Sequence, residues 1–284
     1  MIRTQSMFLV TAFGSCAVCS QVSASPSGLI AEFQHAVDEF DQGQQAKAAQ
    51  PDRARQLLGL AAQRFESLVA AGVHNGYLEY NLGNTYLQLN DIGRAVLHYR
   101  RAERLIPRDP LLLENIGVAR GRSLLNIPPA RKSAVYRNLF FWHYQTSPSS
   151  RFAAALVTYI LFWFLIAMRS LVPRRGWTIA SVFSAVVCVA AGGSLAIQRW
   201  HDRNTPDAVV IAADVVVYKG PAVTYQKQFE QSLQPGVEVT VREDRGDWRR
   251  IELSDGGTGW VPRNTLELVP LQAAPANEAS LLPF

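Results

Sequence analysis

The residue types that most often carry catalysis or bind metals are few in this chain and widely separated. It has five histidines and three cysteines, and none recurs at the spacing of a metal site or of a nucleophile with its base. Cys16 and Cys19 lie in an apolar leader and Cys188 in a long apolar run, so we expect neither a disulfide framework nor a zinc site. The sequence predicts no metal and no cofactor.

Hydrolase chemistry is not predicted either. The sequence has no G-x-S-x-G motif and no phosphate-binding glycine loop. The adjacent carboxylates Glu243 and Asp244 fall in a predicted turn, where solvation is the common reason for such a pair. We therefore expect a protein that is not an enzyme and whose function resides in binding surfaces.

Length and charge set limits on the elements that form those surfaces. With 284 residues the chain has room for two small domains and a membrane segment. The net charge is +5, but the arginines are scattered and many flank apolar runs, which favours contact with anionic lipid headgroups over nucleic acid. Plain solvation of helix faces is the alternative explanation for these basic residues.

The first 24 residues have the pattern of a signal peptide. Arg3 gives a short basic start, an apolar stretch follows, and Val22-Ser23-Ala24 is typical of a cleavage site. An uncleaved signal anchor is the alternative, and either form would export the residues that follow.

Two apolar runs, residues 152–172 and 177–198, are long enough to cross a membrane as helices. The loop between them, residues 173–176, contains Arg174 and Arg175, and the positive-inside rule places such a loop in the cytoplasm. Both flanks would then be exported, as the leader also predicts. A buried hairpin in a soluble core is the alternative.

Small residues recur at every fourth position of the second run and predict a smooth helix face. We expect the first run to pack against this face, with a partner's transmembrane helix as the alternative occupant. The face consists of Ala180, Ser184, Cys188, Gly192 and Ala196.

Residues 76–109 have apolar and small residues at helical spacing in two runs, separated by a turn at Asn90 and Asp91. This unit resembles the tetratricopeptide repeat. The seven matching signature positions are Leu82, Gly83, Tyr86, Ala95, Tyr99, Ala102 and Pro107. Glu79 departs from the signature, because a large apolar residue usually stands there. Since one helix pair cannot bury its apolar face alone, we predict an all-α superhelix of about two and a half repeats over residues 29–125.

The resemblance to this repeat implies a peptide-binding groove on the concave face. Asparagine amides in such grooves pair with both N–H and C=O groups of an extended peptide, and Asn84 and Asn115 occupy the matching positions. The predicted groove residues are Tyr80, Asn84, Gln88, Asn115 and Arg122. The alternative is that these polar residues only solvate a structural stack.

After the second apolar run the sequence changes to short β-branched runs separated by turns, which predicts a small all-β barrel over residues 206–270. The five expected strands are residues 208–211, 215–218, 236–242, 248–253 and 259–262. Gly220-Pro221 at the first turn and Gly259-Trp260-Val261 near the end resemble a bacterial SH3-type domain.

That resemblance implies binding of cell-wall peptides or protein segments. The candidate groove residues are Tyr218, Tyr225, Trp248 and Trp260, and the alternative is that the tryptophans complete the core. Residues 126–151 are rich in aromatic side chains and predict an interfacial linker, or a segment packed beneath the helical stack. Residues 271–284, rich in Ala and Pro, predict a disordered tail.

The order of leader, repeats, two apolar runs and SH3-type barrel resembles the BatE family of aerotolerance-operon proteins, over nearly the whole mature chain. The resemblance implies a bacterial inner-membrane protein with both soluble domains facing the periplasm. Implied partners are membrane proteins with von Willebrand A domains and a MoxR-type ATPase system. The leading hypothesis is a non-catalytic adaptor in an envelope complex with a stress-resistance role, and the alternative is a sensor that binds peptidoglycan through the barrel.

Overall fold

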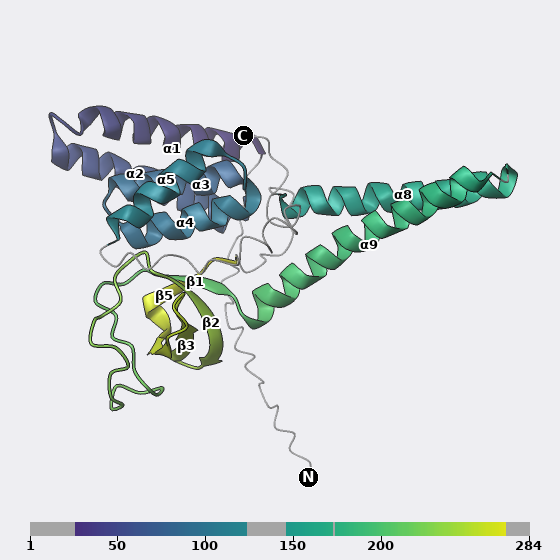
Figure 1. The fold of residues 1–284 in the computed structure, drawn as a ribbon. Helices are drawn as coiled ribbons and strands as arrows, with labels where there is room; N and C mark the ends of the chain where they lie inside the picture. The colour runs from purple at the N-terminus through teal and green to yellow at the C-terminus, as the bar shows by residue number, and fades with distance from the viewer. Residues whose placement is uncertain (1–25, 124–145, 173, 271–284) are drawn as a thin grey trace, which may run out of the picture.

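The computed structural model describes residues 26–123, 146–172 and 174–270. Figure 1 shows a stack of N-terminal helices, a long helical hairpin that projects from it, and a small antiparallel sheet beneath the stack. The signal peptide predicted for residues 1–24, the tail predicted for 271–284 and most of the linker predicted for 126–151 lie outside the described residues.

The N-terminal part is helical, as predicted, and consists of two hairpins and a further helix. The helices are α1 (Pro26–Ala46), α2 (Pro51–Ala70), α3 (Gly76–Gln88), α4 (Ile92–Leu105) and α5 (Pro110–Arg122). Helix α1 packs on α2, α3 packs on α4, and α5 packs on α4.

The helix boundaries follow from local chemistry. The side chains of Asn75, Asp91 and Asp109 accept hydrogen bonds from backbone N–H groups in the first turns of α3, α4 and α5. The turn between α3 and α4 lies at the expected place, and Asn90 there adopts a left-handed φ of 62°, which asparagine tolerates better than most residues.

Two positions of α3 explain how the second hairpin packs. A Cβ at Gly83 would lie 2.4 Å from the ring of Tyr99, so α4 approaches this closely only because the residue is glycine. Glu79, the one departure from the repeat signature, is fully buried, and its Oε2 lies 2.7 Å from Nδ1 of His98. His98 in turn stacks on the ring of Tyr86. A polar partner on α4 therefore accompanies the buried carboxyl group.

The hairpin consists of α8 (Pro148–Leu171) and α9 (Arg175–Asn204). Both helices are long and apolar enough to cross a membrane, as expected, and most of their large apolar side chains are exposed. Helix α8 begins before the predicted run, and α9 continues beyond residue 198 and leads directly into the sheet. The loop between the helices is shorter than the predicted residues 173–176, because α9 already begins at Arg175.

The C-terminal sheet has five antiparallel strands in the order β4-β3-β2-β1-β5. They are β1 (Asp207–Val210), β2 (Glu238–Arg245), β3 (Trp248–Glu252), β4 (Thr258–Pro262) and β5 (Leu266–Leu268). A register shift between Val241 and Glu243 interrupts the pairing of β2 with β3.

One expected strand, residues 215–218, is not a regular strand. Its residues form isolated bridges, Val215 with Leu233 and Tyr218 with both Lys227 and Trp260. Because the partners change along the segment, no continuous ladder develops. The fifth strand is instead β5, after the last expected run.

Candidate protein-interaction site

Three of the predicted groove residues meet on the face shared by α3 and α5. Asn84 Oδ1 accepts hydrogen bonds from the Tyr99 hydroxyl at 2.7 Å and from Asn115 Nδ2 at 2.9 Å. Asn115 Nδ2 also lies 2.9 Å from the hydroxyl oxygen of Tyr80. The side chains of Tyr80, Asn84 and Asn115 are half-buried. We call these four residues, Tyr99 included, the amide cluster.

The amide cluster leaves part of its hydrogen-bonding capacity unused. Among the described residues, no hydrogen bond involves the Asn84 amide nitrogen or the Asn115 side-chain oxygen. A side-chain amide offers two N–H donors and a carbonyl acceptor with two lone pairs. The cluster thus presents both a donor and an acceptor.

Burial makes the Tyr99 hydroxyl of the cluster harder to ionise. Burial raises the pKa of Tyr99 above its ordinary value near 10, the nearby Tyr80 adds to the rise, and Arg122 opposes it. Tyr99 therefore remains a hydroxyl donor to Asn84 at neutral pH.

The other two predicted groove residues lie apart from these bonds. Gln88 Oε1 accepts a hydrogen bond of 2.6 Å from Lys47 Nζ, so it connects the end of α1 with the end of α3. Arg122 is exposed at the end of α5 and acts on Tyr99 through its charge.

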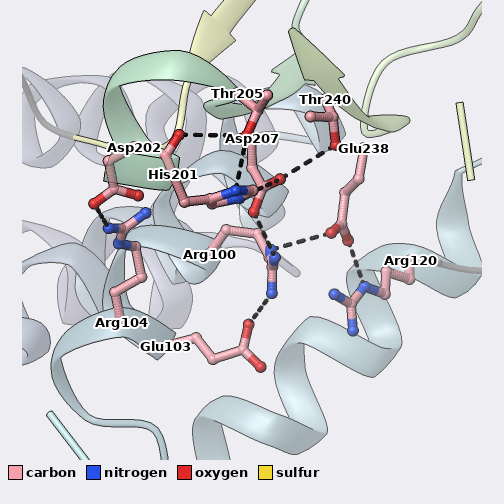
Figure 2. Close-up of polar contacts among 10 residues, drawn as sticks. All are labelled: Arg100, Glu103, Arg104, Arg120, His201, Asp202, Thr205, Asp207, Glu238 and Thr240. Carbon is pink, nitrogen blue, oxygen red and sulfur yellow. Dashed lines mark hydrogen bonds and ion pairs between the residues drawn. The ribbon is translucent and has the colours of Figure 1, made fainter. Parts of the chain in front are cut away.

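A second polar site, which no sequence pattern predicted, joins α4 and α5 to the sheet. Figure 2 shows Arg100 of α4 among the carboxylates of Glu103, Asp207 and Glu238. Arg100 Nε lies 3.1 Å from Glu238 Oε2, and Arg120 Nε of α5 lies 2.7 Å from Glu238 Oε1. One carboxylate of β2 thus holds arginines from two helices.

The carboxylates at this site favour the charged form of Arg100. Burial alone would lower the pKa of Arg100, but the attraction of Glu238, Glu103 and Asp207 outweighs it and raises the pKa above the ordinary arginine value. Arg100 is therefore a permanent cation in this contact.

Two more arginines of α4 extend the contact, one to β5 and the other to α9. Arg101 Nη2 donates to Glu267 Oε1 at 2.7 Å and to the Leu268 carbonyl at 2.9 Å, which binds α4 to β5. Arg104 is paired with Asp202 near the end of α9. We call the ion pairs of Arg100, Arg101, Arg104 and Arg120 the junction.

Apolar packing continues across the junction. Val209 of β1 and Val269 are buried in the core of the helical part rather than in the core of the sheet. A Cβ at Gly93 of α4 would lie 2.9 Å from both Ile211 Cα and the Val210 carbonyl oxygen, so backbone approaches backbone there. The helical part and the sheet are thus packed against each other as one unit.

The predicted aromatic residues of the barrel have different environments. Tyr218 and Trp248 are half-buried and meet edge to face, with ring centroids 5.6 Å apart. Trp248 also lines a cavity of about 890 Å³ bordered by Arg101 of α4 and by β5. Trp260 is 7% exposed and belongs to the core, whereas Tyr225 is exposed.

Along the hairpin, the contact between the helices is displaced from the predicted smooth face. Ser184 Oγ donates to the Thr158 carbonyl at 2.7 Å, and Cys188 Sγ lies 3.5 Å from the Ala155 carbonyl oxygen. Ala180 and Gly192 are half-buried and Ala196 is exposed. A spacing of four residues advances about 40° beyond a full turn of an α-helix, so such a row drifts off the contact.

Comparison with known protein families identifies one part of the chain. Residues 212–267 match the bacterial SH3 domain family, so the C-terminal sheet is a domain of the bacterial SH3 class. No curated protein and no solved structure matches the chain.

Proposed function

We propose that this protein is a non-catalytic, membrane-anchored adaptor that binds an extended protein segment at the face shared by α3 and α5. The amide cluster carries the proposal, because Asn84 and Asn115 lie side by side and retain an unused donor and an unused acceptor. A peptide unit in an extended chain needs one of each. The tetratricopeptide-like spacing of residues 76–109 supports the same reading.

The membrane anchor is the hairpin of α8 and α9. Its exposed large apolar side chains would be solvated by lipid rather than by water. Under this proposal the two flanking parts lie on one side of the bilayer, in the periplasm of a bacterium, as the leader and the basic loop predict. The order of the parts further suggests a BatE-like role in envelope complexes with von Willebrand A and MoxR-type partners, under oxidative or envelope stress.

A pull-down from solubilised membranes tests the adaptor proposal. The double variant N84A/N115A removes both amides from the cluster, and we expect partner recovery to fall about tenfold or more because two hydrogen-bonding groups of the site are lost. The control Q88A removes an amide one turn further along α3 that is already bonded to Lys47. Equal recovery with N84A/N115A and with wild type would contradict the proposal.

The bacterial SH3 domain favours a second function, binding of cell-wall peptides. Trp248 and Tyr218 form an aromatic pair, and Trp248 lines the cavity between the sheet and α4. The test is co-sedimentation of the full chain in detergent with purified wall sacculi, comparing wild type with W248A. The full chain is needed because Val209 and Val269 are buried against the helical part. Absence of wild-type sedimentation would remove this alternative.

A further inference from the structure

A second cavity, of about 930 Å³ and open to the outside, lies between α8, α9 and β2 at the end of the hairpin nearest the sheet. One part of its wall is apolar and comes from the hairpin, including Phe152 of α8 and Leu195 and Ala196 of α9. Another part is polar and includes the last turns of α9 and residues of β2. The cavity therefore changes from apolar to charged along the direction of α9.

The charges in this cavity do not cancel. Asp202 is paired with Arg104, Asp244 with Arg249, and Glu243 with Arg245, so each lining carboxylate has a cationic partner. Arg242, which also lines it, is paired with Glu252. This leaves two lining arginines to consider.

Arg199 and Arg203 lie one turn apart on α9, and both are exposed. No ion pair or hydrogen bond joins either of their side chains to another residue in the described part of the chain. Two uncompensated guanidinium groups at this spacing present a strong site for a phosphate, which arginine binds with paired N–H donors.

The position of these arginines along α9 matches the depth of a lipid headgroup. The helix has 30 residues and is about 45 Å long, which exceeds the hydrocarbon thickness of about 30 Å. The uncharged run ends at Gln198, so Arg199 and Arg203 follow directly beyond the apolar segment. Phe152 and Ala196 line the same cavity as the two arginines, where the acyl chains of a lipid would begin.

We propose that this cavity binds an anionic phospholipid, with its phosphate on Arg199 and Arg203 and its acyl chains along Phe152, Leu195 and Ala196. The inference rests on the proposed membrane anchoring of the hairpin. The ion pair of Arg104 with Asp202, which both line the cavity, joins the end of α9 to α4. Bound lipid would therefore stabilise the hairpin against the helical part and the sheet.

The test is native mass spectrometry of the full chain in non-ionic detergent with equal amounts of phosphatidylglycerol and phosphatidylcholine. We expect wild type to retain phosphatidylglycerol in preference to phosphatidylcholine, and R199Q/R203Q to lose about tenfold or more of that lipid, because each basic residue contributes about a factor of five. The matched control R174Q/R175Q removes the same charge at the other end of the hairpin and should retain the lipid. R199K/R203K should retain most of it, which separates charge from folding.

Three results would overturn the lipid site. They are equal retention of the two lipids by wild type, equal loss in R199Q/R203Q and R174Q/R175Q, and displacement of the lipid by soluble glycerol 1-phosphate, which would indicate a site for free phosphate. Carbonate extraction of native membranes separates this from the anchoring proposal. If wild type is extracted, the anchoring fails, and if it stays while the lipid preference is absent, only the lipid site fails.

Discussion

The helical part has two faces that differ in how their polar groups are matched. At the junction, arginines of α4 and α5 are paired with carboxylates of the sheet and of α9. On the face shared by α3 and α5, neutral amides and phenols bond to one another and keep unused donors and acceptors. The charged face already holds its partner within the chain, whereas the neutral face keeps a donor and an acceptor that no described residue uses.

The largest expected effect comes from adding a side-chain atom where the backbone of α4 lies against the backbone of the sheet. Gly93→Ala would place a Cβ 2.9 Å from the backbone of Val210 and Ile211, which cannot move aside as a flexible side chain would. We expect a loss of about 2 to 3 kcal/mol in stability, measured by urea unfolding of the detergent-solubilised protein followed by tryptophan fluorescence.

Gly117→Ala is the matched control, because nothing lies within 4 Å of the added Cβ on α5. It should be neutral or stabilise the protein by up to about 1 kcal/mol. If the two substitutions have the same effect, the sheet is not packed tightly on α4.

A smaller loss is expected from removing the shared carboxylate of the junction. Glu238→Ala leaves Arg100 and Arg120 without this partner, and we expect a cost of about 2 kcal/mol because the site is only partly buried. The cost should be smaller in high salt, because salt weakens the attraction between Glu238 and the two arginines in the wild type. Glu252→Ala, which breaks an exposed pair with Arg242, should cost less than about 1 kcal/mol. Equal costs would contradict the distinction between a junction and ordinary surface pairs.

The neutral face should respond to alkaline pH and little to salt. Burial raises the pKa of Tyr99 above the ordinary value near 10. The unfolded chain therefore loses this proton first as pH rises, so the stabilising contribution of Tyr99 is complete below about pH 10 and declines above it.

Tyr99→Phe tests this account most simply. We expect a loss of about 1 kcal/mol at neutral pH from the missing hydrogen bond to Asn84, and a flatter decline above pH 10. Urea unfolding of both proteins at neutral pH and at a series of alkaline pH values would check both. A variant with the same alkaline decline as wild type would show that Tyr99 titrates as an ordinary exposed phenol.

The sequence predicts local packing well because local spacing determines it. Gly83 and Tyr99 belong to one helix pair, and their separation in the sequence already implies the close approach, in which a Cβ at Gly83 would lie 2.4 Å from the Tyr99 ring. The partner of Glu79 was not predicted, since a buried carboxyl at an apolar position gives no sign of which residue lies opposite. His98 supplies that partner from α4.

The junction could not be predicted for a different reason. Arg101 and Glu267 are 166 positions apart, and no periodic pattern connects a helix arginine with a strand carboxylate over that distance. In the sequence, the arginines at 100, 101 and 104 look like an ordinary solvated helix face. Only the structure shows that they contact the sheet and α9. The class of the C-terminal domain was predicted because its turn glycines and its tryptophan have characteristic spacing, but the assignment of residues 215–218 as a strand was wrong, since bridges alternate between partners there.

Photo-cross-linking from the neutral face in native membranes would show whether a partner protein binds there. A photoreactive residue at Tyr80 should capture a partner protein, and the capture should disappear when Asn84 and Asn115 are both changed to Ala. The same residue placed at Arg55, exposed on α2, is the control and should capture little. Capture from Tyr80 that is unchanged in N84A/N115A, or equal to that from position 55, would contradict the adaptor role of this face.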